Sequence, residues 1–242
     1  MNDLFFKVPE KIREMELTTM HRIPAFMIAL ALAASSLTHA ATVTTMVDIN
    51  GGDGPTQAGW LAFDPTGPTT FTDALGAGRD LTVEITQNGA LRDRGTTVTG
   101  TYAGLSNLLR DFYGSRSNND IVTLTLTLDA GAYHFLSYHH DAEASSTNTQ
   151  EVEFTRIGSG VIQTDVIHSS DAPTDIVTFE DTFTLASATS VQFQIQKTAL
   201  ASNNGEFGFN GFELTLIPEP TTAAMLVMGG LLVMRRRRGL IQ

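Results

Sequence analysis

The sequence has no cysteine, and positive charge is scarce in its central part. Without cysteine no disulfide framework can form, so the fold must be stabilised by burial of a core, with or without a bound cation. Residues 41–217 contain seven Lys and Arg against 21 Asp and Glu, a net charge of −14. A surface of this sign repels nucleic acid and anionic lipid. We therefore expect no nucleic-acid partner.

Recognisable catalytic motifs are also missing. The sequence contains no nucleophile elbow, zinc-protease motif or phosphate-binding loop. Glycoside hydrolysis needs two carboxylates at a defined separation in space, and among 21 acidic residues the sequence cannot identify such a pair. We therefore predict that the protein is not an enzyme.

The last 25 residues combine a short motif, an apolar stretch and a basic end. They comprise Pro218-Glu219-Pro220, the apolar residues 223–234, and Arg235, Arg236, Arg237 and Arg238. Four adjacent arginines resist entry into hydrocarbon and stay in the cytoplasm by the positive-inside rule. This order resembles the PEP-CTERM signal, which bacterial exosortases recognise on exported proteins. The resemblance implies that residues 218–242 are a sorting signal with a transmembrane helix, and that an exosortase is a partner.

The first 40 residues have the features of a secretory signal peptide. Met20-His21-Arg22 provides a basic start, residues 23–34 are apolar, and small residues precede a cleavage site after Ala40. Residues 1–19 are charged and mixed, which indicates either a wrongly assigned start codon or a long basic region. We expect export by the Sec machinery, at least transient anchoring in the membrane, and then a location at the cell surface or in the extracellular matrix.

The central region, residues 41–217, has the length of one domain and is rich in alternating apolar residues. In 121–128, for example, valine and leucine alternate with threonine, the period-2 pattern of a half-buried strand. We predict an all-β fold, a single jelly-roll-type antiparallel β-sandwich. The expected strands are 42–49, 81–86, 121–128, 132–140, 151–157, 161–167, 175–185, 191–196 and 212–216.

Two local features refine this prediction. Asp129-Ala130-Gly131 has the composition of a turn, so 121–128 and 132–140 are expected to form a hairpin. Apolar residues at helical spacing predict one short helix over 105–112, which includes Phe112.

Several short motifs are similar to those of malectin-like and galactose-binding-like domains. They are residues 47–54, which enter a glycine-rich loop, residues 59–64 with a Trp and an Asp, the D-x-G-x-Y pattern at 129–133, and the closing strand at 210–214. This resemblance implies a jelly-roll sandwich. Exosortase systems commonly accompany exopolysaccharide production, so extracellular polysaccharide is the expected partner.

The candidate ligand-binding residues are Trp60, Tyr138, His139 and Asp141. Trp60 is the single tryptophan, and its ring either stacks on a sugar or plugs one end of the sandwich. The adjacent His139 and His140 point to opposite faces of a regular strand, so they cannot chelate one metal together. One histidine, with Asp141, is expected to bind sugar hydroxyls, and ordinary packing at the end of a strand is the alternative.

The acidic loops suggest a structural calcium ion. Asp48, Asn50 and Asp53, beside flexible glycines, supply the hard oxygen ligands that Ca²⁺ prefers. Their spacing does not fit the helical calcium-binding loop, because the position of its bidentate Glu falls on Gly59. By contrast, Arg110, Asp111, Tyr113 and Arg116 are expected to surround a solvated loop.

Together these observations predict an exported, surface-sorted, non-catalytic protein whose β-sandwich binds extracellular polysaccharide. Two alternatives remain at this point. One is an enzyme that degrades polysaccharide on the same fold, and the other is a purely structural component of the matrix.

Overall fold

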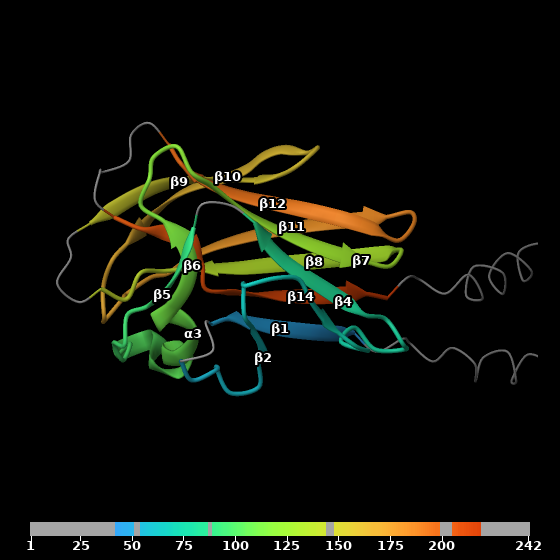
Figure 1. Ribbon diagram of the computed structural model, residues 1–242, viewed down its shortest axis with the longest axis horizontal. Helices are drawn as coiled ribbons and strands as arrows, with labels where there is room; N and C mark the ends of the chain where they lie inside the picture. Colours follow the sequence, from blue (N-terminus) through green and yellow to red (C-terminus); the bar gives the residue numbers. More distant parts are fainter. Residues whose placement is uncertain (1–41, 51–53, 87–88, 144–147, 199–204, 219–242) are drawn as a thin grey trace, which may run out of the picture. The chain divides into compact units, whose positions relative to one another are not determined.

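The alternating residues of the central region form two sheets that pack face to face, as the computed structural model shows (Figure 1). The structure describes residues 42–50, 54–86, 89–143, 148–198 and 205–218. The expected signal peptide and residues 219–242 lie outside this part. Among the described residues, no helix is both long enough and apolar enough to span a membrane.

The first sheet has five strands. Their order is β11 (Val177–Leu185), β8 (Gly131–His139), β14 (Gly211–Ile217), β1 (Val43–Ile49) and β2 (Leu61–Phe63). Neighbouring strands are antiparallel, except that β1 and β2 run parallel.

The second sheet has six strands, all antiparallel to their neighbours. Their order is β10 (Gly160–His168), β9 (Thr149–Arg156), β12 (Thr189–Lys197), β7 (Ile121–Leu128), β4 (Leu81–Thr86) and β3 (Thr69–Phe71).

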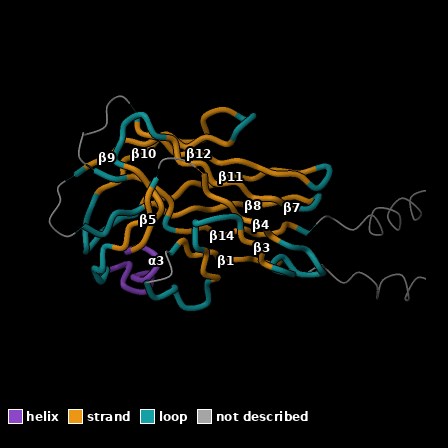
Figure 2. The backbone as a smooth tube through the Cα atoms, in the orientation of Figure 1, coloured by secondary structure: helices purple, strands orange, loops and turns teal. Residues whose placement is uncertain are grey.

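A small third sheet was not predicted. It contains β13 (Phe207–Phe209), β6 (Asp111–Ser115) and β5 (Ala90–Asp93). A 3-10 helix, η1 (Gly100–Leu105), leads into the short helix α3 (Ser106–Arg110). The helical segment lies at the same end of the sandwich as β5 (Figure 2).

Phenylalanine rings from both large sheets fill the space between them. Phe135 of β8 stacks on Phe193 of β12, with ring centroids 4.0 Å apart. Phe154 of β9 stacks on Phe179 of β11 at 4.4 Å. All four rings are fully buried, and each pair joins one sheet to the other. Burial of these large rings is the main stabilising contribution that the core can make.

The antiparallel β-sandwich and most strand positions are confirmed, but the predicted hairpin is wrong. β7 pairs with β4 and β12 in the six-stranded sheet, whereas β8 pairs with β11 and β14 in the five-stranded sheet. Asp129 and Ala130 therefore carry the chain from one layer to the other. Both strands bury their alternate residues in the same core, which is possible because they face it from opposite sides.

The predicted helix over 105–112 is correct in its first part and wrong at its end. The α-helix ends at Arg110, and Phe112 lies in β6, where its side chain is buried. The pattern of apolar residues continues without a break across this boundary, so spacing alone could not locate it. The short strands β2, β3, β5, β6 and β13 were missed because none is long enough to show a clear alternation.

The third sheet depends on a close approach between two glycines. Gly114 of β6 lies opposite Gly208 of β13, and a Cβ atom on Gly114 would overlap with the carbonyl oxygen of Phe207. We expect Gly114→Ala to lower the free energy of unfolding by about 3 kcal/mol, because the backbone would have to move apart. Urea denaturation measures this difference. Gly104→Ala is the matched control, since no atom lies within 4 Å of a Cβ there. Equal stability of the two variants would contradict the close approach.

Candidate functional site

One buried asparagine organises the end of the sandwich where the candidate residues lie. Asn210 connects β13 to β14 and is 0% exposed. Its backbone N–H donates to Tyr138 O, and its carbonyl accepts from Ile49 N. Its side chain accepts from the backbone N–H of His140 and donates to the carbonyls of Leu109 and Asp111. Asn210 therefore fixes the ends of β1, β8 and α3 and the start of β6 relative to one another.

Trp60 and Tyr138 form an aromatic pair on the outer face of the five-stranded sheet. Their ring centroids are 5.7 Å apart, with the rings inclined at 68°, and both side chains are half-buried. Gly211 lies opposite Tyr138 in the sheet, and a Cβ atom there would overlap with Leu108 Cδ1 and the Val47 carbonyl oxygen, both at 2.5 Å, and come within 3.3 Å of the Trp60 ring. The absence of a side chain at Gly211 therefore allows α3 and the indole to pack closely beside Tyr138.

The loop before Trp60 is held by Gln57. The Gln57 carbonyl accepts a hydrogen bond from Trp60 N at 3.0 Å, and the Gln57 N–H donates to Asp48 Oδ2 at 2.6 Å. Its side-chain amide donates to Gly104 O at 2.9 Å. The position of the indole is thus tied to β1 and to the helical segment.

Polar groups continue the surface beside the aromatic pair. Tyr138 Oη donates to Glu213 Oε1 at 2.6 Å. Burial and the Glu213 carboxylate both raise the pKa of Tyr138, so the phenol remains a donor at neutral pH. Farther along the same face, His134 Nε2 lies 2.6 Å from Glu180 Oε1, and the Glu180 side chain is 67% exposed. The face therefore offers aromatic rings with neighbouring hydrogen-bonding groups, the combination that suits a polyhydroxylated ligand.

His139 lies on the opposite side of β8 from Tyr138 and is fully buried in the core. Its Nδ1 donates to Gly208 O at 2.6 Å, because a carbonyl can only accept, and its Nε2 accepts from Ser137 Oγ at 2.7 Å. The ring packs against Phe179 with centroids 4.7 Å apart. Burial lowers the pKa of His139 to about 3, so the ring is neutral at physiological pH. From this position His139 cannot contact a ligand on the face of Tyr138.

Asp141 is also buried, at 1% exposed, and has a structural partner. Arg94 binds it through two hydrogen bonds, Nε to Oδ1 at 2.6 Å and Nη2 to Oδ2 at 2.9 Å, and Ser169 Oγ adds a third at 3.1 Å. Arg94 also donates to Glu206. Of the four predicted ligand-binding residues, the structure thus brings together Trp60 and Tyr138 and places His139 and Asp141 elsewhere.

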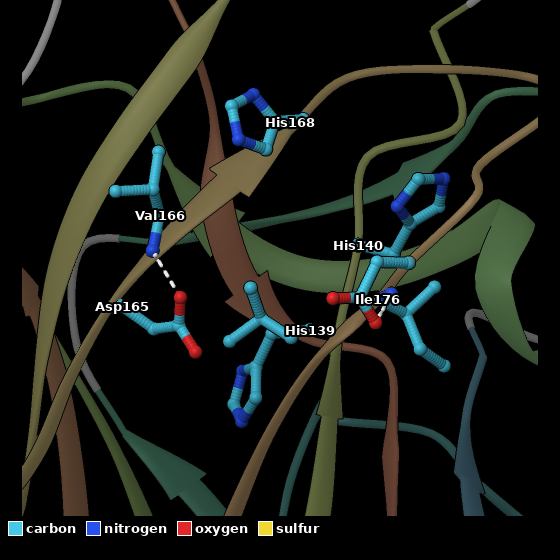
Figure 3. Close-up of a pocket in the computed structure, with 8 residues that line it drawn as sticks. His139, His140, Asp165, Val166, His168 and Ile176 are labelled. Atoms are coloured by element: carbon cyan, nitrogen blue, oxygen red, sulfur yellow. Dashed lines mark hydrogen bonds between the residues drawn. The ribbon is translucent and has the colours of Figure 1, made fainter.

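A pocket of about 140 Å³ lies between β10 and the residues that lead into β11 (Figure 3). Its lining residues are His139, His140, Asp165, Val166, His168, Asp175, Ile176 and Val177. Much of its polar lining is used locally, since Asp165 accepts from Val166 N and His140 Nε2 donates to Ser170 O. Within the described residues, no group of three or more His, Cys, Asp or Glu is placed to hold a metal ion.

Two of the three residues considered for calcium, Asp48 and Asn50, are among the described residues. Asp48 is fully buried, and burial raises its pKa to about 6 against the opposing effect of the Gln57 N–H. Asn50 is buried and donates through Nδ2 to Thr56 Oγ1 at 2.9 Å. Asp53 lies outside the described residues.

The prediction that Asp111 lies in a solvated loop is wrong. Asp111 begins β6 and is 1% exposed, because Asn210 holds its backbone at the core. Burial, with the nearby Asp93 carboxylate, raises the pKa of Asp111 to about 7. Arg116, by contrast, has a side chain that is 57% exposed.

Sequence reasoning did not predict the structural role of the residues that build this region. Asn210, Gln57, Glu213 and Asp111 are single polar residues of common types, and no spacing distinguishes them from surface positions. The one available signal was the Asn-Gly pair at 210–211 before the last strand.

No protein-family model matches the chain, and no curated protein matches it. Similar solved structures include a calcium-binding mutant of Bacteroides uniformis β-glucuronidase 2, with 13% identity, a TM-score of 0.43 and coverage of 76% of this chain and 19% of that one. A family 35 carbohydrate binding module from Clostridium thermocellum has 13% identity, a TM-score of 0.33 and coverage of 62% and 98%. The ANX2 ectodomain from Arabidopsis thaliana has 11% identity, a TM-score of 0.41 and coverage of 74% and 50%. The chain spans about a fifth of the β-glucuronidase, and scores below 0.5 carry no information on ligand or activity.

The buried His139 predicts a specific loss of stability in acid. The unfolded chain takes up a proton near the ordinary pKa of about 6.5, whereas the folded protein does not until about pH 3. The stability contributed by the neutral ring is therefore complete above pH 6.5 and falls as the pH decreases below it. Between pH 6.5 and 4.5 this single group should lower the free energy of unfolding by about 2–3 kcal/mol.

Urea denaturation at several pH values measures this effect against His139→Gln, which lacks the titrating group. The wild-type curve should be steeper than that of His139→Gln in this pH range. His168→Gln is the matched control, because that ring is exposed. Parallel curves for wild type and His139→Gln would contradict the burial of a neutral ring.

Proposed function

We propose that this chain is an exported, surface-sorted, non-catalytic protein whose jelly-roll-type sandwich binds neutral extracellular polysaccharide. The binding site is the outer face of the five-stranded sheet at Trp60 and Tyr138. The observation that carries the proposal is the half-exposed aromatic pair, positioned over Gly211 and flanked by Glu213.

The pair has the chemistry that sugar rings require. The C–H faces of a pyranose stack on aromatic rings, and hydroxyl groups at the rim of the sugar need donors and acceptors. Glu213 provides carboxylate oxygens beside Tyr138, and the exposed Glu180 and Thr182 continue the same face. This surface follows the strands rather than closing around one ring, which suits a chain more than a single small sugar.

The charge of the domain selects against anionic polymers. With a net charge of −14 over residues 41–217, long-range attraction cannot recruit an acidic polysaccharide. Stacking on two rings is a modest interaction, of the order of 1 kcal/mol for each contact. Binding by one domain is therefore weak, and retention in a matrix would depend on many copies engaging one polymer.

The two alternatives make different predictions in the same assay. An enzyme on this fold would release soluble product from the polysaccharide. A purely structural matrix component would neither bind nor cleave it.

We expect Trp60→Ala to weaken binding to a neutral soluble polysaccharide by about tenfold, because one stacking surface is lost. Its melting temperature should stay within a few degrees of wild type. Affinity electrophoresis in polysaccharide-containing gels measures binding, and thermal melting reports stability. Tyr138→Ala should weaken binding in the same way, whereas Tyr138→Phe keeps the ring and should retain most of it.

Tyr102→Ala is the control, since Tyr102 is another half-buried tyrosine and lies on η1. His168→Ala tests the pocket of Figure 3 as an alternative location for the ligand. If Trp60→Ala melts early instead, with a loss of several kcal/mol, the indole serves as core packing. Unchanged binding in both Trp60→Ala and Tyr138→Ala would rule out the aromatic pair as the site.

The proposed sorting rests on the two ends of the chain. Pro218-Glu219-Pro220, the apolar stretch and the four arginines form a signal for exosortase, and residues 1–40 form a signal for Sec export. As a helix, about a dozen apolar residues span roughly 18 Å, less than the hydrocarbon thickness of about 30 Å. The membrane anchor is therefore a transient one that precedes release at the surface.

In a host that contains the exosortase, the mature protein should begin at Ala41 and end near Pro218–Pro220. The reason is that both signals are removed once their receptors have acted. Mass spectrometry of the native surface protein determines both ends. A C-terminus at Gln242 would show that the tail is kept as an anchor.

A further inference from the structure

Two buried carboxylates, one in β1 and one in β6, have oxygen atoms that accept no hydrogen bond. Asp48 Oδ1 and both oxygens of Asp111 accept no hydrogen bond within the described part of the chain. The two side chains are 0% and 1% exposed, so bulk water does not replace the missing partners. Buried polar atoms in folded proteins nearly always have a partner, and an orphaned one calls for an ion or an ordered water.

The two carboxylates lie in the same place although they belong to different strands. Asp48 is opposite Gly211 in the sheet, and the carbonyl of Asp111 is bonded to Asn210, the residue before Gly211. Gly54 packs directly on Asp111 Oδ2, where a Cβ atom would overlap with that oxygen. Gln57 N–H donates to Asp48 Oδ2, so residues 54–57 contact both acids.

The local charge is not balanced by the side chains present. Arg110 Nε forms an ion pair with Asp111 Oδ1 at 3.4 Å, and the same guanidinium is bonded to Asp93, with Nη2 2.7 Å from Oδ1. Asp93 and Asp111 thus share one guanidinium, and Asp48 has no ion pair among the described residues. A buried excess of carboxylate is unfavourable unless a cation or a proton compensates it.

We propose that Asp48 and Asp111 together bind one calcium ion at the end of β1. The available donors are oxygen atoms, which hard cations prefer, and a divalent ion balances the excess charge of this group. Calcium takes six to eight oxygen ligands and accepts backbone carbonyls and water beside its carboxylates. Two carboxylates can therefore supply the charged ligands of one ion, with backbone carbonyls and water as the remaining ligands.

The proposed ion differs from the site expected from the sequence alone. Asp111 lies 63 positions after Asp48 along the chain and becomes a ligand only through the fold. Asn50 contributes indirectly, because its Nδ2 is bonded to Thr56 and holds the returning loop. The ion would join that loop to β6.

Thermal melting of the full-length chain after treatment with EDTA tests the proposal. Addition of millimolar CaCl₂ should raise the melting temperature by about 5 °C, since a ligand that binds only the native state stabilises it by mass action. Asp111→Asn and Asp48→Asn should each lose this response. In the absence of metal, both variants should melt at or above the wild-type temperature, because each removes one carboxylate from a buried group that has more carboxylates than basic partners. Isothermal titration should give one calcium ion per chain for wild type.

Glu180→Gln is the matched control, because it removes an exposed carboxylate of the same sheet and should keep the full response. Equal ionic strength of KCl should have no effect. No response of the wild type to calcium, or a full response of Asp111→Asn, would overturn the site, and an equal response to MgCl₂ would overturn its assignment to calcium. These measurements contain no polysaccharide, so their failure leaves the proposed glycan site unaffected.

Discussion

The hydrogen bonds of Asn210 are the constraint on which the rest of this region depends. A buried amide must satisfy all of its polar groups, and Asn210 does so by bonding to three separate segments of chain. The same bonds bring Tyr138 to the outer face and Asp111 to the core. One residue between two strands thereby determines where both the aromatic pair and the acidic pair lie.

The aromatic pair and the proposed calcium site are connected through one short loop. Gln57 donates to Asp48 from its backbone and receives the backbone N–H of Trp60. An ion at Asp48 would therefore hold the loop on which the indole depends. Stability and ligand binding would then be coupled through the backbone of Gln57, without any direct contact between ion and sugar.

The buried carboxylates of this fold have two kinds of environment. Asp141 and Glu206 are compensated by Arg94, which hydrogen-bonds to both of them. Asp48 Oδ1 and Asp111 Oδ2 have neither a hydrogen bond nor an ion pair among the described residues, and Asp111 Oδ1 has only the ion pair with Arg110 at 3.4 Å. The contrast matters because both kinds of site are equally buried, so solvent cannot account for the difference. Where a buried carboxylate has no full arginine partner, a proton or a cation can compensate its charge.

The sequence by itself determined the class of fold and most of the strands, because a period of two in apolar residues follows directly from the geometry of a half-buried strand. Only the tertiary structure decided that β7 and β8 belong to different sheets. Each strand buries alternate residues in the core, and this pattern is the same whether the two strands pair with each other or lie in opposite sheets. The tertiary structure likewise decided which side of β8 is the core, and so removed His139 from the ligand-binding surface and left Tyr138 on it. The pairing of Asp48 with Asp111 could not be predicted, because long-range contacts between single polar residues leave no periodic pattern in a sequence.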